Sequence, residues 1–224
     1  MSAPLFTEAL ESRMLMSGNS LSASVNVTIE LDRLQIRQDL LKFKSDSISC
    51  YTTLQADVLN LRGDHLKDAK TVTPLIAKFR ADIKAMRTQL RVDRLTERQN
   101  VLADESVIVG ELKQIVLDKG NATAEAADHA TLLADRIKLQ NDAIAGLDAR
   151  LSTRQGALVT LTADMQNILT AAQSDPNASP KLVNDLTKLS VDRSACLNTM
   201  SADLQTLITD RTKLVVDLTA LQSA

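Results

Sequence analysis

The chain has 224 residues, of which 44% are hydrophobic but only 2% aromatic, and its formal net charge is −2. The apolar residues are therefore mainly aliphatic, which favours packed helices and disfavours a base-stacking surface. The small net charge gives no global attraction for nucleic acid, and two cysteines exclude a disulfide framework. No run of eighteen apolar residues predicts a transmembrane helix.

The N-terminal residues 5–17 read LFTEALESRMLMS. This stretch resembles the LEPR-XLL motif of many large exported or surface-associated bacterial proteins, although Ser12 stands where that motif has proline. The resemblance implies an exported or envelope location, with the motif acting as a sorting element. The alternative is a short amphipathic helix. The matching residues are Glu8, Ala9, Leu10, Glu11, Arg13, Leu15, Met16 and Ser17.

Residues 17–24 have the composition of a flexible linker, so residues 1–24 form a segment apart from the rest. Four helices are expected after it, at about 25–70, 74–118, 122–173 and 180–222. Thr73 before Pro74 and Ser179 before Pro180 suit helix starts. Gly120 suits the left-handed residue after a helix, and Asn121 suits the cap of the next one.

Each expected helix carries apolar residues at alternating spacings of four and three, which predicts one buried stripe per helix. The third helix shows this most clearly, from Leu133 through Leu147 to Ile168, and the fourth carries Leu186, Leu204 and Leu218. The first helix is expected to bury Leu31, Leu34, Leu41, Ile48, Tyr51, Leu54, Val58 and Leu61. The second is expected to bury Ile76, Phe79, Ile83, Met86, Leu90, Leu95, Leu102, Val109, Leu112 and Val116.

These patterns predict an all-α protein of four long antiparallel helices, an up-down-up-down bundle with coiled-coil-like packing. The alternative is two helical hairpins placed in series or paired with another copy of the chain. Several polar residues interrupt the apolar stripes and could specify the register within one chain or between chains. They are Gln140, Arg154, Arg193 and Arg211.

A stripe of basic residues follows the second helix at the same four-three spacing, and we call it the basic stripe. It is a candidate face for an anionic polymer, lipid headgroups or another partner. The favoured alternative is a charged flank that faces acidic residues, for which Asp57, Asp64, Asp68, Asp185 and Asp192 are candidates. The basic stripe consists of Arg80, Lys84, Arg87, Arg91, Arg94 and Arg98.

The sequence contains no motif for catalysis, for a cofactor or for a metal site. No Glu-x-x-His pair, Gly-rich phosphate loop or Cys-x-x-Cys pair occurs. Cys50 and Cys196 fall at similar heights on the first and last helices, which makes a disulfide one candidate and two unpaired thiols the favoured alternative.

The expected function is therefore that of a non-enzymatic structural or protein-interaction bundle, exported or associated with the cell envelope. A protein partner or self-association would carry that function. The alternative is a cytoplasmic coiled-coil scaffold, or a binder of an anionic polymer such as nucleic acid through the basic stripe.

Overall fold

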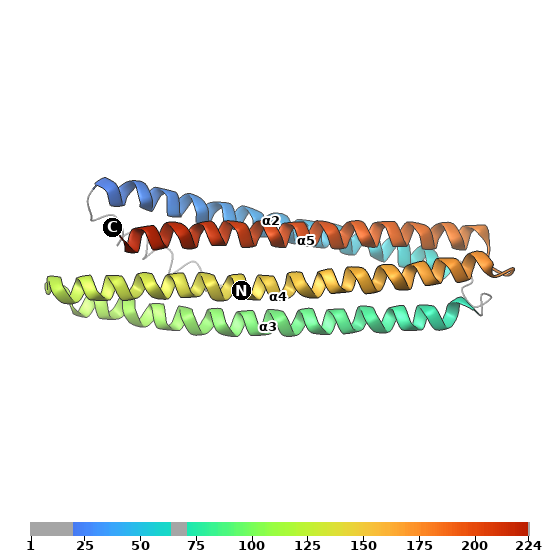
Figure 1. Ribbon diagram of the computed structural model, residues 1–224, viewed down its shortest axis with the longest axis horizontal. Helices are drawn as coiled ribbons and strands as arrows, with labels where there is room; N and C mark the ends of the chain where they lie inside the picture. Colours follow the sequence, from blue (N-terminus) through green and yellow to red (C-terminus); the bar gives the residue numbers. More distant parts are fainter. Residues whose placement is uncertain (1–19, 64–70, 224) are drawn as a thin grey trace. The chain divides into compact units, whose positions relative to one another are not determined.

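The computed structural model describes residues 20–63 and 71–223, and this part of the chain contains four α-helices and no strand. Figure 1 shows the helices in chain order: α2 (Ser20–Gly63), α3 (Val72–Leu117), α4 (Ala122–Ser174) and α5 (Pro180–Gln222). The expected all-α class and four-helix bundle are therefore confirmed. The N-terminal residues that resemble the LEPR-XLL motif, together with Asp64 and Asp68, lie outside the described residues.

The turn between α3 and α4 uses the residues that the sequence suggests. Gly120 has a φ of 98°, a left-handed conformation that other residues adopt only with strain. Asn121 then caps α4, because its side-chain oxygen accepts a hydrogen bond from the Ala124 backbone N–H at 3.3 Å. The chain reverses within the few residues between the two helices.

Helix α5 begins in the same way, since the Ser179 hydroxyl accepts a hydrogen bond from the Leu182 N–H at 3.1 Å. Asp175, in the preceding loop, accepts hydrogen bonds from the Thr71 hydroxyl at 2.6 Å and the Asn177 N–H at 2.9 Å. The Thr71 bond is the main reason why the pKa of Asp175 is lowered. These bonds hold the loop against the start of α3.

Two helix starts differ from the sequence-based expectation. Helix α3 begins at Val72, before Pro74; proline is tolerated there because the N–H groups of a first turn have no partner within the helix. Helix α2 begins at Ser20, inside the expected linker. No glycine or proline stands between Ser20 and Val25, so nothing in that stretch stops a helix.

The helices divide into two compact units, each built from segments of all four. Of the described residues, the first unit takes in those up to Gln38, Leu95–Gly146 and those from Leu207 onwards. The second unit consists of Asp39–Arg94 and Leu147–Thr206.

Side-chain contacts fix which helices pair in the second unit. Lys42 and Asp57 of α2 bind Asp203 and Lys188 of α5, respectively. Asp57 follows Lys42 in α2 by as many residues as Lys188 precedes Asp203 in α5. The two helices therefore run antiparallel. In the same unit, α3 contacts α4 through Lys78 and Asp164.

The first unit shows the same two pairings. Lys213 of α5 binds Asp32 of α2, and Lys138 of α4 binds Asp104 of α3. Helices α3 and α4 also approach each other closely at Gly146, where an added Cβ would lie 2.5 Å from Cγ of Glu97. A glycine is therefore needed at this point of α4.

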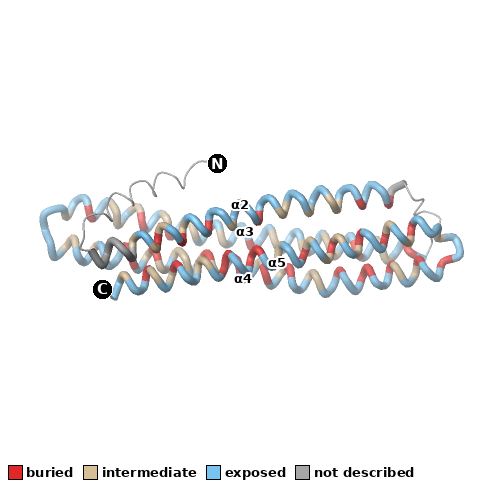
Figure 2. The backbone as a smooth tube through the Cα atoms, turned by 90° about the horizontal axis from the view of Figure 1, so that it is seen from above, coloured by how far each residue is buried: buried red, intermediate tan, exposed pale blue. Residues whose placement is uncertain are grey.

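Apolar residues form a core in each unit. The second unit buries Leu61 of α2, Phe79 of α3, Leu161 of α4 and Leu186 of α5 in one cluster. In the first unit, Ile108 and Ile115 of α3 pack with Leu132 of α4. Figure 2 shows that buried positions recur at intervals along each helix, separated by exposed ones.

The predicted stripes of α4 and α5 are confirmed, since Leu133, Leu147, Ile168, Leu186, Leu204 and Leu218 are all buried. The stripes predicted for α2 and for the later part of α3 are largely wrong. Leu34, Leu41 and Ile48 of α2 are 50%, 67% and 59% exposed, and Leu95 and Leu102 of α3 are 53% and 50% exposed.

Helix α2 instead buries a second stripe that includes charged residues. Between residues 26 and 61 of this helix, where side-chain burial is described, the buried positions are Ile29, Asp32, Ile36, Phe43, Asp57 and Leu61. An aspartate normally marks the outward face of a helix, because burying an unpaired charge is costly. Here lysines from α5 bind the buried aspartates, so the inward face looks polar in the sequence.

Candidate functional site

Five lysines each bind a buried aspartate on the neighbouring helix. In every case the lysine stem lies at the surface, and the aspartate side chain that it reaches is at most 6% exposed. A buried carboxylate needs such a partner, because its desolvation would otherwise be uncompensated. The pairs are Lys42–Asp203, Lys78–Asp164, Lys138–Asp104, Lys188–Asp57 and Lys213–Asp32.

Each of these lysines also faces a second aspartate four residues later on its own helix. The distances from Nζ to the carboxylate are 2.9 Å for Lys42–Asp46 and 2.8 Å for Lys78–Asp82. Hydrogen bonding to Asp203, and then to Asp46, raises the pKa of Lys42. The Lys42 hydrogen bond in turn lowers the pKa of Asp46. Both shifts stabilise the charged pair at neutral pH.

A repeated sequence pattern, which is separate from the four-three spacing of the apolar stripes, marks these bridges. Lysine is followed by Phe or Leu, and an aspartate stands four residues after the lysine. The aromatic or aliphatic residue faces inward, as at Phe43 and Phe79, and so places the lysine at the edge of the core. The pattern occurs at the five bridging lysines, Lys42, Lys78, Lys138, Lys188 and Lys213, and also at Lys181, which binds Asp185 four residues later.

The polar residues that interrupt the stripes lie inside the units. Arg211 of α5 donates a hydrogen bond of 2.5 Å to Gln140 of α4, which joins two of the four predicted register residues. Arg154 is 5% exposed and donates to the Met200 sulfur at 3.1 Å, with its guanidinium carbon 5.7 Å from the Phe43 ring centre. Burial is the main reason why the pKa of Arg154 is lowered to about 10.

Arg193 resembles Arg154 in its burial and in its contact with an aromatic ring. It is 8% exposed, its guanidinium carbon lies 4.8 Å from the Phe79 ring centre, and its Nε has no hydrogen-bond partner among the described residues. Burial, and then the nearby charge of Arg87, lower the pKa of Arg193 to about 10. Arg193 therefore remains positively charged at neutral pH without a carboxylate partner in the described chain.

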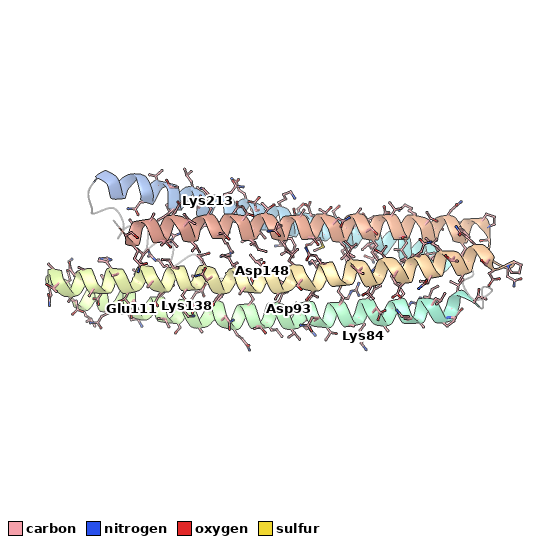
Figure 3. The ribbon with its side chains drawn as sticks, viewed as in Figure 1. Lys84, Asp93, Glu111, Lys138, Asp148 and Lys213 are labelled. Atoms are coloured by element: carbon pink, nitrogen blue, oxygen red, sulfur yellow. The ribbon has the colours of Figure 1, made fainter. Side chains whose placement is uncertain are left out.

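All six residues of the basic stripe are exposed on α3. Figure 3 labels Lys84 among the side chains of this helix. Of the acidic residues expected to face the stripe, Asp57 and Asp192 bind Lys188, and Asp185 binds Lys181. None of the described carboxylates forms a direct ion pair with Arg80, Lys84, Arg87 or Arg91. These three aspartates are thus engaged by lysines of α5.

Four residues of the basic stripe line a pocket of about 670 Å³ within the second unit. All four helices contribute to it, and the buried side chains that form its apolar wall are Leu61, Phe79, Met165, Ile168, Leu186 and Leu189. No acidic residue is among the described residues that line it. We call it the basic pocket; its cationic residues are Arg80, Lys84, Arg87, Arg91 and Arg193.

The two cysteines lie side by side, as the antiparallel register of α2 and α5 requires. Both are free thiols that are partly buried. The pKa of Cys196 is raised to about 12, first by burial and then by its hydrogen bond to the Cys50 thiol. The favoured expectation was two unpaired thiols, and the disulfide, the other candidate, stays a prediction for the oxidised protein.

The described residues bring together no group of three His, Cys, Asp or Glu side chains that could hold a metal ion. No helix in the described part of the chain is long and apolar enough to cross a membrane. Comparison with protein-family models, with curated proteins and with solved structures found no match for this chain.

Proposed function

We propose that this protein is a non-enzymatic helical bundle that works through contact between helices of two chains, with self-association as the first case. The observation that carries this proposal is an exposed apolar stripe on the α2 segment of the second unit. We call it the outer stripe, and it consists of Leu41, Ile48 and Tyr51, which are 67%, 59% and 62% exposed.

The spacing of the outer stripe supports this proposal. Leu41 and Ile48 are one heptad apart and Tyr51 follows three residues later, which is the spacing of a coiled-coil seam. Single exposed apolar residues are common on proteins and need no explanation. The residues of the outer stripe, in contrast, are aligned on one exposed face of α2, and the opposite face of this helix is already buried. A helix from a second chain would cover these exposed side chains.

Replacing Leu41 and Ile48 together by Glu should abolish self-association without unfolding the bundle, because both side chains are exposed. We expect the molar mass of the wild type, measured by light scattering, to rise with concentration, and that of the variant to stay monomeric. Val159→Glu is the matched control, since Val159 is 72% exposed on α4. A wild type that is monomeric at every concentration would contradict self-association.

We further propose that the protein acts outside the cytoplasm or at the cell envelope, supported by the LEPR-XLL-like residues 5–17. Fractionation of the native host with an antibody to the protein tests this. Recovery of the protein only in the cytosolic fraction would contradict the proposed location and would leave the interaction proposal intact.

A second candidate function is the binding of an anionic polymer by the basic stripe, favoured by its exposure and by the lysine partners of the neighbouring aspartates. Replacing Arg87, Arg91 and Arg94 by Glu should then abolish a salt-sensitive gel shift of nucleic acid. If the wild type shifts no nucleic acid at low salt, this candidate fails.

A further inference from the structure

The basic pocket combines two features that a closed helical core does not need. Its wall is apolar and large enough for a small ligand, because ligand pockets have volumes of roughly 300–1,000 Å³ and this one has about 670 Å³. Its cationic side chains come mainly from one helix, α3, and they lie beside that wall without a carboxylate among the described lining residues.

Arg193 adds an observation that is independent of the cavity. This arginine extends from α5 into the lining of the basic pocket, where it is 8% exposed and lies over the Phe79 ring. Its Nε has no hydrogen-bond partner among the described residues; the same holds for Arg154, but of the two only Arg193 lines the basic pocket. A buried guanidinium usually binds a carboxylate or phosphate, often with two parallel hydrogen bonds.

The like charges around Arg193 point in the same direction. Arg87 is close enough to disfavour the charged form of Arg193, and it lines the same pocket. An anion held between the two guanidinium groups would relieve this repulsion and supply the acceptor that Arg193 lacks. Elsewhere in the bundle, five of the buried aspartates show the opposite arrangement, because each binds a lysine from the neighbouring helix.

We propose that the basic pocket binds a free amphiphile with an anionic head group and an unbranched apolar chain, such as the anion of a medium-chain fatty acid. The head group lies between Arg193 and Arg87, and the chain lies along Val58, Ile76 and Ile83, the apolar lining residues that are not fully buried. An anionic polymer fits less well, because most of the wall is apolar and is formed by all four helices of the unit.

The first test is a titration of the full chain with decanoate. Calorimetry measures the binding, and NMR detects the signal of the ¹³C-labelled decanoate carboxylate. We expect one decanoate per chain and an affinity that rises on the order of fourfold for each methylene from hexanoate to decanoate. Decanol should bind at least about tenfold more weakly, because it lacks the charge. Equal binding of acetate and decanoate would overturn the proposal.

Variants at the pocket separate ligand binding from folding. Arg193→Met keeps an apolar stem over Phe79 and removes the charge, and Arg87→Gln changes an exposed residue at the edge. Each should weaken decanoate binding at least about tenfold. Arg98→Gln, on the same helix but not in the pocket lining, is the matched control and should bind as the wild type does. Unchanged binding by a folded Arg87→Gln variant would overturn the proposal.

A cosedimentation experiment distinguishes a free amphiphile from a membrane lipid. We expect no cosedimentation of the protein with phosphatidylglycerol vesicles, because a pocket lined by four helices admits a ligand that has left the bilayer. Cosedimentation that is lost in Arg87→Gln would assign the pocket to a lipid headgroup in the membrane and overturn the free-amphiphile proposal. None of these outcomes depends on the outer stripe, so this proposal and the proposed function can fail separately.

Discussion

The variant Lys42→Met should lower the melting temperature on the order of 10 °C, because it leaves the buried Asp203 carboxylate without its cation. Lys42 itself is largely exposed, with 59% of its side chain accessible, so little apolar packing is lost. The effect comes from Asp203, which is 5% exposed and whose other carboxylate oxygen has no hydrogen-bond partner among the described residues. Thermal unfolding followed by circular dichroism measures it.

Lys44→Met is the matched control, because Lys44 lies two residues away on the same helix, is exposed and has no ion pair with a described residue. It should change the melting temperature little. The double variant Lys42→Met with Asp203→Leu should recover most of the loss, since a buried ion pair can be replaced by apolar residues. Equal effects of Lys42→Met and Lys44→Met would contradict this account of the bridges.

The pH dependence of the bridge follows from the raised pKa of Lys42. A lysine with a raised folded-state pKa contributes its full stabilisation below the ordinary lysine pKa of about 10.4 and loses it as the pH rises through the folded value. The difference between the wild type and Lys42→Met should therefore be constant from about pH 7 to 9 and decrease only in strongly alkaline solution.

The variant Leu161→Ala should lower the free energy of unfolding by about 3 kcal/mol, because Leu161 is 1% exposed in the core of the second unit. The truncation removes buried methyl groups and leaves a cavity that the rigid helices fill only in part. Urea unfolding measures the change, which should appear as a lower midpoint with an unaltered slope.

Leu41→Ala is the matched control for Leu161→Ala, because it makes the same truncation at an exposed leucine. The sequence pattern places Leu41 in the buried stripe of the first helix, whereas the structure leaves it 67% exposed. We expect this variant to change the free energy of unfolding of the monomer by no more than about 0.5 kcal/mol. A loss as large as that of Leu161→Ala would mean that the outer stripe is buried and would contradict the orientation of α2.

Heptad spacing was sufficient to predict the fold class and the inward faces of α4 and α5. It failed for α2 because this helix has apolar residues on two faces, and the more leucine-rich face is the exposed one. The spacing of one helix cannot reveal that Asp32 or Asp57 will meet a lysine from a distant part of the chain. That information lies in the register between helices, which tertiary packing sets.

The candidate site was predicted in part. The basic stripe and Arg193 were both recognised in the sequence, the basic stripe as either an anion-binding face or a charged flank, and Arg193 as a register residue. Their convergence on one pocket depends on the way α3 and α5 approach each other in the second unit. The lysine pattern that marks the ion-pair bridges is visible in the sequence. The sequence does not show which buried aspartate of the neighbouring helix each lysine binds.

The pairing of α2 with α5 is the central claim, because it decides which face of α2 is outward. Cys50 and Cys196 test it with native residues. Oxidation of the dilute protein by copper phenanthroline removes two electrons and two protons from the thiols and forms one disulfide bond. We predict a mass lower by two hydrogen atoms in the single chain, and a digest containing one linked peptide with both cysteines. Oxidation that gives only disulfide-linked dimers, or two cysteines that never link, would contradict the pairing.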